Sequence, residues 1–405
     1  MNICIFSDTY SPQVNGVVTS IITLKEGLIA QGHKVYIVTV NSEKLKTTIN
    51  DDEIRISAIK LKKFDGHCLA TSLNTKVLKQ LREWDIDLIH TQTEFVVGTI
   101  GRIYAKRAHI PLVHTYHTLY EDYMHYVTSG LFDKQARMMA RHVTKYICNF
   151  SKEVIVPTPK IAKLLRKYRV KSNIYTLPTG VDLRKFFKNN FTQQHLLDFK
   201  VDLGFKEDDF LITYIGRLAK EKDIDKIISG FSQVQEELPG AKLVIIGDGP
   251  ARKELEEQAK ELKVKGVYFL GKVPWVDIPV YYNISDVFVT ASKSETQGLT
   301  VLEALAASTP VVCVDDPSFD VVEHDYNGMK FETASDLAHC IRFVYNNPAH
   351  LNYLSGNAFE SIQDLDINIF INNAVNIYDK VITNKKKRDE VKKLKYRFWR
   401  KKNEK

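Results

Sequence analysis

The chain has 405 residues, 44% hydrophobic and 26% charged, a composition typical of globular proteins and a length that predicts two domains rather than one core. Its net charge of +8 is concentrated, because residues 385–405 hold twelve Lys or Arg and three acids whereas the rest carries a net −1. No apolar run approaches the roughly 20 residues that cross a bilayer, and the N-terminal residues do not resemble a signal peptide. Five scattered cysteines without a CxxC pair indicate reduced thiols and a cytoplasmic protein rather than a disulfide framework or a zinc site.

Along the first half, apolar runs that predict strands alternate with helical patterns. The run Ile3–Phe6, a polar loop, a helical pattern over 17–28 and the run Val35–Val40 together predict a βαβ unit. Further strands are predicted at Ile54–Ile59, Asp87–His90, Leu112–His117, Glu153–Pro157 and Ile174–Pro178. This layout is typical of a doubly wound α/β domain.

The pattern restarts after the turn-rich segment Thr179–Leu183. New strands are predicted at Phe210–Ile215, Lys242–Ile246, Val267–Leu270, Asp286–Thr290 and Pro310–Val314. We therefore expect an α/β protein of two Rossmann-like domains, 1–180 and 181–375, facing a central cleft, with a basic amphipathic tail over 376–405. Open α/β sheets bind ligands at the carboxyl ends of their strands, so functional residues are expected in those loops.

Two cations follow the first predicted strand of the second domain. Gly216-Arg217-Leu218 ends that strand, and Lys222 lies four residues further on. A glycine at a strand end lets a ligand approach the backbone, and two cations can neutralise a diphosphate. Taken alone, this spacing favours ordinary surface charges. The turn Gly247-Asp248-Gly249-Pro250 is comparable, and it matches neither the dinucleotide fingerprint nor the P-loop.

A stronger signal is a pair of glutamates with seven residues between them, Glu295 and Glu303. The segment leaves a predicted strand and enters a helix, so the amides of Gly298, Leu299 and Thr300 lie at the helix N-terminus, where phosphate oxygens bind well. Carboxylates suit sugar and ribose hydroxyls because they accept hydrogen bonds. Helix capping by acids explains Glu295 tolerably and Glu303 less well.

The order of these motifs over nearly the whole chain resembles the retaining glycosyltransferases of family four, which have the GT-B fold. The resemblance implies that Arg217 and Lys222 hold the donor diphosphate, that Glu303 binds the nucleotide ribose and that Glu295 binds the transferred sugar. It also implies that Gly16 approaches the donor phosphates and that His117 is the active-site histidine near the reacting face of the sugar.

The chain departs from the family pattern at three places. Asn15-Gly16 stands where two glycines are common, Ser308-Thr309-Pro310 stands where Gly-x-Pro is common, and the stretch 314–318 lacks the commoner glycine pair. These departures bear on the choice of donor rather than on the fold.

Residues 6–10 together with 15–20, and residues 114–123, are similar to those of the bacterial monoglucosyl-diacylglycerol synthases. This narrower resemblance implies UDP-glucose as donor substrate and the 3-hydroxyl of 1,2-diacylglycerol as acceptor. It implies no tightly bound cofactor and no metal at the chemical step, because the helix N-terminus and the two cations stabilise the departing UDP. It also implies attack by the lipid hydroxyl on the face that UDP leaves.

Cations recur at helical spacing in the first domain and fill the end of the chain. Lys134, Arg137, Arg141 and Lys145 form a stripe with apolar residues beside or opposite it, and a second cluster follows over 160–171. The tail interleaves Arg397, Trp399 and Arg400 with other basic and aromatic residues. A solvated helix face and a solvated tail are the alternatives. Together the clusters favour docking on an anionic phospholipid membrane, at the cytoplasmic face, and no nucleic-acid motif accompanies them.

Other functions stay open at this point. A family-four enzyme could use another donor, such as UDP-galactose or a GDP-sugar, or another acceptor: a glycosylated lipid, a phosphoinositide, a soluble sugar or a polymer. A non-catalytic membrane-binding GT-B protein and a sugar-nucleotide epimerase or hydrolase are further alternatives. The oligomeric state is not encoded in any motif found.

Overall fold

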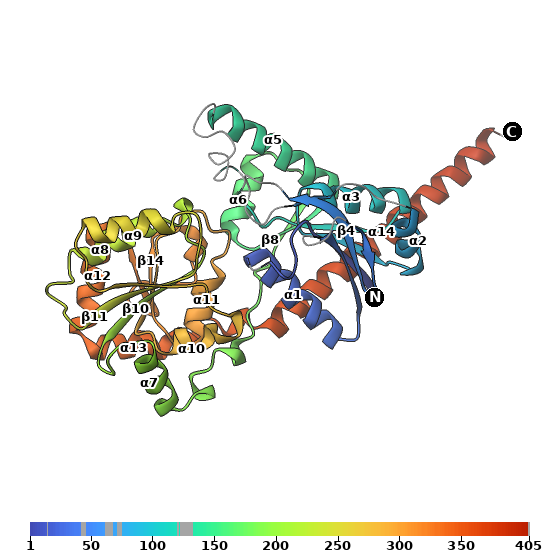
Figure 1. Ribbon diagram of the computed structural model, residues 1–405. Coiled ribbons are helices and arrows are strands. Elements are labelled where there is room, and N and C mark those ends of the chain that lie inside the picture. Colours follow the sequence, from blue (N-terminus) through green and yellow to red (C-terminus); the bar gives the residue numbers. More distant parts are fainter. Residues whose placement is uncertain are drawn as a thin grey trace. The chain divides into compact units, whose positions relative to one another are not determined.

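A computed structural model describes residues 1–13, 15–41, 46–60, 68–70, 75–119, 121 and 133–403, and within these ranges it leaves out the side chains of residues 60, 68–70, 133, 389 and 391–403. The chain forms two compact units, Met1–Gly180 with Ile367–Lys405, and Val181–Asp366 (Figure 1). Each unit is built on a predominantly parallel sheet with helices on its faces, which confirms the α/β fold class with two Rossmann-like domains.

The first unit holds a nine-stranded sheet with the path β3-β4-β2-β1-β6-β7-β8-β9, and β5 pairs with β4. The strands are β1 (Asn2–Phe6), β2 (Lys34–Asn41), β3 (Thr48–Ile49), β4 (Glu53–Lys60), β5 (Cys68–Ala70), β6 (Leu88–Thr91), β7 (Leu112–Thr115), β8 (Glu153–Val156) and β9 (Asn173–Thr176). The helices are α1 (Gly16–Ala30), α2 (Thr75–Glu83), α3 (Val96–Ala108), α5 (Asp133–Ser151), α6 (Pro159–Lys167) and α14 (Ile367–Asn403).

Both faces of this sheet are buried, as strand alternation requires. Ile3 and Ile5 of β1 pack in the core beneath α1 and α14, whereas Cys4 and Phe6 pack in the core beneath α2 and α3. The central strands β4-β2-β1-β6-β7-β8 follow the order 3-2-1-4-5-6 of a Rossmann sheet, so β1, β6 and β7 end side by side at one edge.

The second unit holds a six-stranded parallel sheet with the same order, β12-β11-β10-β13-β14-β15. Its strands are β10 (Phe210–Ile215), β11 (Ala241–Ile246), β12 (Val267–Gly271), β13 (Val287–Thr290), β14 (Val311–Val314) and β15 (Gly328–Phe331). Its helices are α7 (Gln193–Asp202), α8 (Ile224–Ser232), α9 (Arg252–Glu261), α10 (Ile278–Asn283), α11 (Leu299–Ala306), α12 (Ala334–Asn346) and α13 (Pro348–Glu360).

The C-terminal helix departs from the expected boundaries. The second unit ends at Asp366 rather than at 375, and α14 begins at Ile367 and returns to the first unit. Phe370, Ile371, Ala374, Tyr378 and Val381 of this helix are buried in the core beneath α1, so the segment 376–381, predicted to be part of the tail, packs on the first unit through Tyr378 and Val381.

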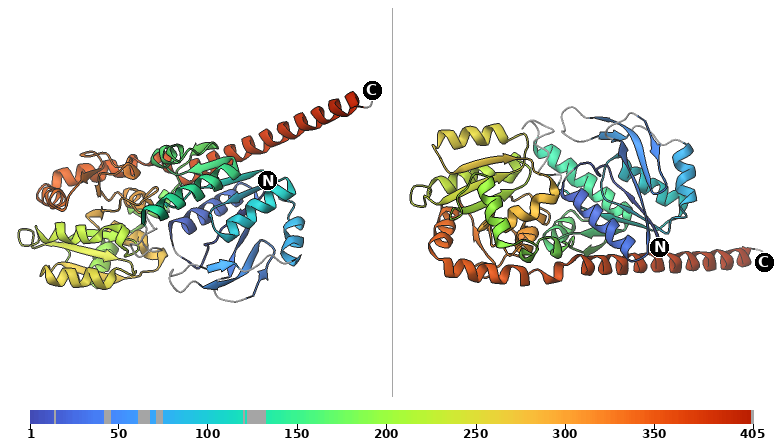
Figure 2. Two further views of the ribbon diagram at one scale, coloured as in Figure 1. Left: turned by 90° about the horizontal axis from the view of Figure 1, so that it is seen from above. Right: turned by 60° about the horizontal axis from the view of Figure 1, so that its bottom comes forward.

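Gly27 of α1 makes the contact with α14 close. A Cβ atom on this residue would lie 2.3 Å from Ile371 Cγ1, which is closer than two carbon atoms can approach without one of them moving. Beyond the packed part, α14 continues past the body of the first unit (Figure 2).

Candidate active site

In the second unit, the loop after β10 carries both predicted phosphate-binding cations. Arg217 lies two residues beyond the strand end and is exposed, and the Tyr214 hydroxyl donates to its carbonyl oxygen at 3.2 Å. Lys222 closes the 3₁₀ turn Lys220–Lys222. The strand end therefore presents one exposed guanidinium and one ammonium within a folded turn.

The ammonium of Lys222 forms an ion pair with the carboxylate of Glu295, 73 residues away along the chain. Their side chains are 18% and 24% exposed, so the pair is shielded but remains open to a ligand. The Ser294 hydroxyl ties the Glu295 loop to the Lys222 turn by donating to the Glu221 carbonyl oxygen at 3.1 Å. The structure thus brings together the residue predicted to bind phosphate and the residue predicted to bind sugar.

The segment predicted to seat phosphate oxygens does open a helix. Gly298 is the N-cap of α11, with a φ of +73°, and a Cβ atom there would lie 2.5 Å from Phe319 Cε1. Only glycine satisfies both conditions. Leu299 and Thr300 are the first two helical residues, and amides in a first helical turn have no acceptor within the helix. They are therefore available to an anionic ligand.

Glu303 is a buried acid in the middle of α11 rather than a surface cap. The Tyr282 hydroxyl, from α10, donates to Glu303 Oε2 at 2.9 Å. Burial raises the pKa of Glu303 to about 7, and the Tyr282 hydrogen bond partly counters that rise. Such a carboxyl exchanges its proton near neutral pH and accepts hydrogen bonds when ionised.

In the first unit, Gly16 is exposed and opens α1. The preceding Asn15 is the N-cap: its side-chain oxygen accepts from the Val18 amide at 3.0 Å, and its amide donates to Thr9 Oγ1 at 3.1 Å. The asparagine that replaces the commoner glycine therefore caps the helix, which a glycine side chain cannot do.

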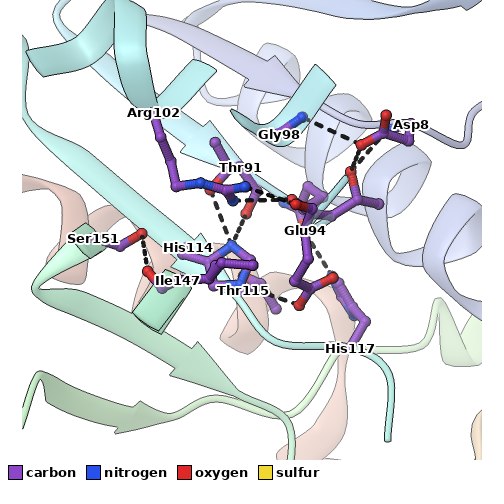
Figure 3. Close-up of polar contacts among 12 residues, drawn as sticks. Asp8, Thr91, Glu94, Gly98, Arg102, His114, Thr115, His117, Ile147 and Ser151 are labelled. Atoms are coloured by element: carbon purple, nitrogen blue, oxygen red, sulfur yellow. Dashed lines mark hydrogen bonds and ion pairs between the residues drawn. The ribbon is translucent and has the colours of Figure 1, made fainter. Parts of the chain in front are cut away.

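His117 lies two residues beyond β7, which ends at Thr115 rather than at the predicted His117. Its Nε2 lies 2.6 Å from Gln92 Oε1 (Figure 3 shows His117 at the edge of the polar cluster). Burial, followed by the charge of nearby His114, lowers the pKa of His117 to about 3. The imidazole is therefore neutral at physiological pH.

Buried polar side chains beside His117 were not anticipated from the sequence. His114 Nε2 lies 3.2 Å from Glu94 Oε1, and Asp8 accepts from the Val97 and Gly98 amides at 2.8 and 3.2 Å (Figure 3). Asp8 thereby caps α3, and burial raises its pKa. The signal that could have found this cluster is its place after β1, β6 and β7, which end at one edge of the sheet.

Helix α5 carries the predicted cationic stripe. Lys134, Arg137 and Arg141 are exposed and Lys145 is partly exposed. Arg141 donates to Glu121 through Nε at 2.6 Å and Nη2 at 2.9 Å, so this cation is already paired. The structure therefore distinguishes Arg141 from the rest of the stripe.

Apolar side chains on α5 are exposed rather than buried. Met139 and Tyr146 are 69% and 71% exposed, and Val143 is also exposed. At 3.6 residues per turn these three share one stripe, whereas Arg137 and Arg141 share another. The prediction that Arg397, Trp399 and Arg400 bind a membrane concerns side chains outside the described ones, although their backbone is helical in α14.

Metal-ligating groups and membrane-spanning helices were sought among the described residues. Among the described residues, no group of three or more His, Cys, Asp or Glu side chains is arranged to hold a metal ion. Over the same ranges, none of the helices combines the length and the apolar character needed to cross a membrane.

Comparison with known proteins places the chain in a family. A model of glycosyltransferase family 4 matches residues 14–185, and a model of the glycosyl transferases group 1 matches residues 198–361. The alpha-monoglucosyldiacylglycerol synthase of Acholeplasma laidlawii is 35% identical, with 96% of this chain and 99% of the relative covered. The enzyme of that name from Streptococcus pneumoniae is 36% identical over 84% of this chain and 77% of its own.

Solved structures agree on the fold. The sucrose-phosphate synthase of Thermosynechococcus elongatus superposes with a TM-score of 0.73 at 20% identity, covering 94% of this chain and 99% of the other. Anabaena HepE in complex with UDP gives a TM-score of 0.70 at 18% identity, covering 94% and 100%. The chain therefore belongs to glycosyltransferase family 4, has the GT-B fold, and falls in the group of the alpha-monoglucosyldiacylglycerol synthases.

Proposed function

We propose that this glycosyltransferase moves glucose from UDP-glucose to the 3-hydroxyl of 1,2-diacylglycerol with retention, producing α-monoglucosyl diacylglycerol. The observation that carries the proposal is the ion pair between Lys222 and Glu295. Glu295 lies three residues before Gly298, the N-cap of α11. The two relatives named as alpha-monoglucosyldiacylglycerol synthases support glucose as the sugar and diacylglycerol as the acceptor. UDP as the nucleotide rests on the family resemblance.

The second unit supplies the donor chemistry in this proposal. Arg217, Lys222 and the amides of Leu299 and Thr300 neutralise the diphosphate, while Glu303 accepts hydrogen bonds from the ribose. When the diphosphate binds Lys222, the ammonium turns from Glu295, and the freed carboxylate accepts hydrogen bonds from the glucose hydroxyls. Electrostatic stabilisation of the departing UDP by fixed cations and amides is the main source of rate in this scheme, and we propose that no divalent metal is needed.

The transfer step exchanges one bond at the sugar. The bond between glucose C1 and the UDP phosphate oxygen breaks, and a bond forms between C1 and the lipid O3 on the same face of the ring. The hydroxyl proton passes to the departing phosphate oxygen. His117, neutral under these conditions, hydrogen-bonds a sugar hydroxyl and takes no proton from the acceptor.

Docking on an anionic membrane brings the enzyme to its lipid. The exposed Met139, Val143 and Tyr146 of α5 suit the interface between headgroups and acyl chains, and the cations on the other stripe of the same helix suit anionic headgroups. Each basic residue near an anionic surface contributes about 1 kcal/mol. We propose a peripheral enzyme at the cytoplasmic face of the cell membrane.

The test is glycolipid formation and UDP release from UDP-glucose, with diacylglycerol vesicles that contain or lack anionic phospholipid. Glycolipid that needs diacylglycerol, increases with anionic lipid, persists in EDTA and disappears in Glu295→Ala supports the proposal. Glu332→Ala, which removes an exposed carboxylate of the same unit, is the matched control and keeps full activity.

Each part of the proposal has its own contradicting result. UDP release that is indifferent to lipid contradicts the lipid acceptor and directs the search to soluble sugars. A β-anomeric product contradicts retention, and loss of activity in EDTA that Mg²⁺ restores contradicts the metal-independent step. Binding to vesicles without any turnover favours a non-catalytic membrane protein.

A further inference from the structure

Buried hydrogen bonds within the first unit link the C-terminal helix α14 to His90. The Tyr378 hydroxyl lies 2.7 Å from His90 Nδ1, and the two rings meet edge to face at 5.6 Å. The other imidazole nitrogen, Nε2, lies 2.7 Å from Thr115 Oγ1. Because all three side chains are buried, bulk water is kept from these bonds, and the His90 ring is held at both nitrogens.

The carboxamide of Gln92 connects His90 to His117. Gln92 Nε2 lies 3.3 Å from His90 Nδ1 and 3.4 Å from His90 Nε2, and this near equality places the amide nitrogen over the face of the ring. Amide N–H groups are attracted to such a face. The NH₂ end of Gln92 therefore turns toward His90, and the carbonyl end turns toward His117, 2.6 Å from its Nε2.

This orientation of Gln92 selects one tautomer of His117. A carbonyl oxygen only accepts hydrogen bonds, so His117 Nε2 must carry the hydrogen. In the neutral ring the lone pair then belongs to Nδ1, which can accept a hydrogen bond from a sugar hydroxyl. A Gln92 amide turned by 180° would present NH₂ to His117 and favour the opposite tautomer.

We propose that Tyr378 is a positioning residue for glucosyl transfer: by fixing His90, and through it the Gln92 carboxamide, it holds His117 with its hydrogen on Nε2 and its lone pair on Nδ1. The inference rests on the proposed function insofar as His117 contacts the transferred glucose. By this proposal α14 not only packs on the first unit but also orients a histidine of the candidate active site.

A small cavity beneath α14 allows the proposal to be tested by removing a single oxygen atom, the hydroxyl of Tyr378. Its volume is ≈ 10 Å³, about one water molecule, and His90, Gln92, Thr115 and Tyr378 are among its lining residues. Removing the Tyr378 hydroxyl leaves the phenyl ring packed and makes room for water beside His90. Tyr378→Phe therefore frees the His90 ring without opening a large hole in the core.

The first measurement is the kinetics of Tyr378→Phe with UDP-glucose and diacylglycerol vesicles. We expect kcat to fall about tenfold, as when a partner that orients a functional histidine is removed, with the KM for UDP-glucose and the UDP affinity unchanged. The matched control is Tyr175→Phe, which also loses a phenol hydroxyl near α14, one bonded to Glu153 at 3.1 Å outside this network. The control should keep wild-type kcat.

The second measurement reads the tautomer of His117 directly, from the ¹⁵N chemical shifts of its imidazole. Wild type should show the Nε2–H form, and Tyr378→Phe should show a mixture. An unchanged kcat or an unchanged tautomer in Tyr378→Phe overturns the proposal. If the wild-type enzyme transfers no glucose to diacylglycerol, the proposed function has failed, and the tautomer alone decides the positioning role.

Gln92→Glu provides a second variant if Tyr378→Phe folds poorly. A carboxylate at this position accepts from His117 Nε2 and stabilises the imidazolium, which has no lone pair on Nδ1. As the pH falls below about 7, kcat should fall further in this variant than in wild type, in which Glu303 titrates near that pH, with His90, His114 and Glu94 still in place as the other titratable groups facing His117. A pH profile that matches wild type overturns the proposal.

Discussion

The two units share a strand order and differ in what they place at the strand ends. After β10 and β13, the second unit presents exposed or shielded charges, with Lys222 and Glu295 in contact. After β6 and β7, the first unit presents neutral imidazoles and amides held in a buried network that includes His117 and Gln92. One scaffold thus supports charge neutralisation in one unit and orientation of hydrogen bonds in the other.

Their surface helices differ in the same sense. In α9 of the second unit, cations pair with acids one turn away: Arg252 with Glu256 and Lys253 with Glu257. The sequence of α5 in the first unit offers its four cations a single acid, Asp133, and the same helix exposes the apolar side chains of Met139, Val143 and Tyr146. The charges of α9 are paired within the helix and suit a surface in water, whereas the unbalanced cations and exposed apolar side chains of α5 suit an anionic membrane interface.

The largest effect should follow from Glu295→Ala. Without the carboxylate, Lys222 can still bind the diphosphate but the glucose loses its hydrogen-bond acceptor, so kcat should fall by about 10²–10³-fold. Titration with UDP, followed by calorimetry, should show nearly unchanged affinity. A proportional loss of UDP affinity would instead assign Glu295 to nucleotide binding.

Glu303 should make the second unit lose stability as the pH rises. Its folded pKa of about 7 lies above the unfolded value near 4.5, so the folded state binds more protons between these values. From pH 5 to pH 7 the free energy of unfolding should fall by about 2 kcal/mol through this group. Thermal unfolding of Glu303→Gln, measured without donor, should lack that fall, and identical pH slopes would contradict the assignment.

Membrane docking should depend on the apolar stripe of α5. Met139→Asp places a charge where the proposal puts the lipid interface, and vesicle sedimentation should show about tenfold weaker binding, since lost apolar burial costs over 1 kcal/mol. Val276→Asp is the matched control, because Val276 is 77% exposed and lies in the second unit. Equal losses in both variants would argue against a docking face on α5.

The smallest effect should separate two cations of the stripe. Arg137→Gln should weaken binding to anionic vesicles about fivefold, equivalent to about 1 kcal/mol, and the loss should shrink at high salt. Arg141→Gln should weaken binding less, because the Arg141 charge is compensated by Glu121. Equal effects would show that the Glu121 pair opens on the membrane.

Functional motifs at strand ends could be predicted from the sequence where all of their residues lie in one continuous segment. The Glu295-x7-Glu303 spacing and the glycine at 298 follow a predicted strand and His117 ends another, and the structure places each of them after a strand end. Gln92 and His90 were missed although they belong to the end of β6, because only the pairing of β6 with β7 puts them beside His117. Tyr282 gave no signal, since it lies on a different helix from Glu303.

The sequence by itself determined the α/β alternation, the restart near residue 180 and the positions of the charged strand-end loops, because hydrophobic periodicity and turn residues are local properties. Tertiary structure alone decided that Lys222 meets Glu295, that Arg141 is paired, and that α14 returns to the first unit and brings Tyr378 to His90. These contacts join segments separated by 20 to 288 residues. They depend on how buried faces pack, which no local pattern records.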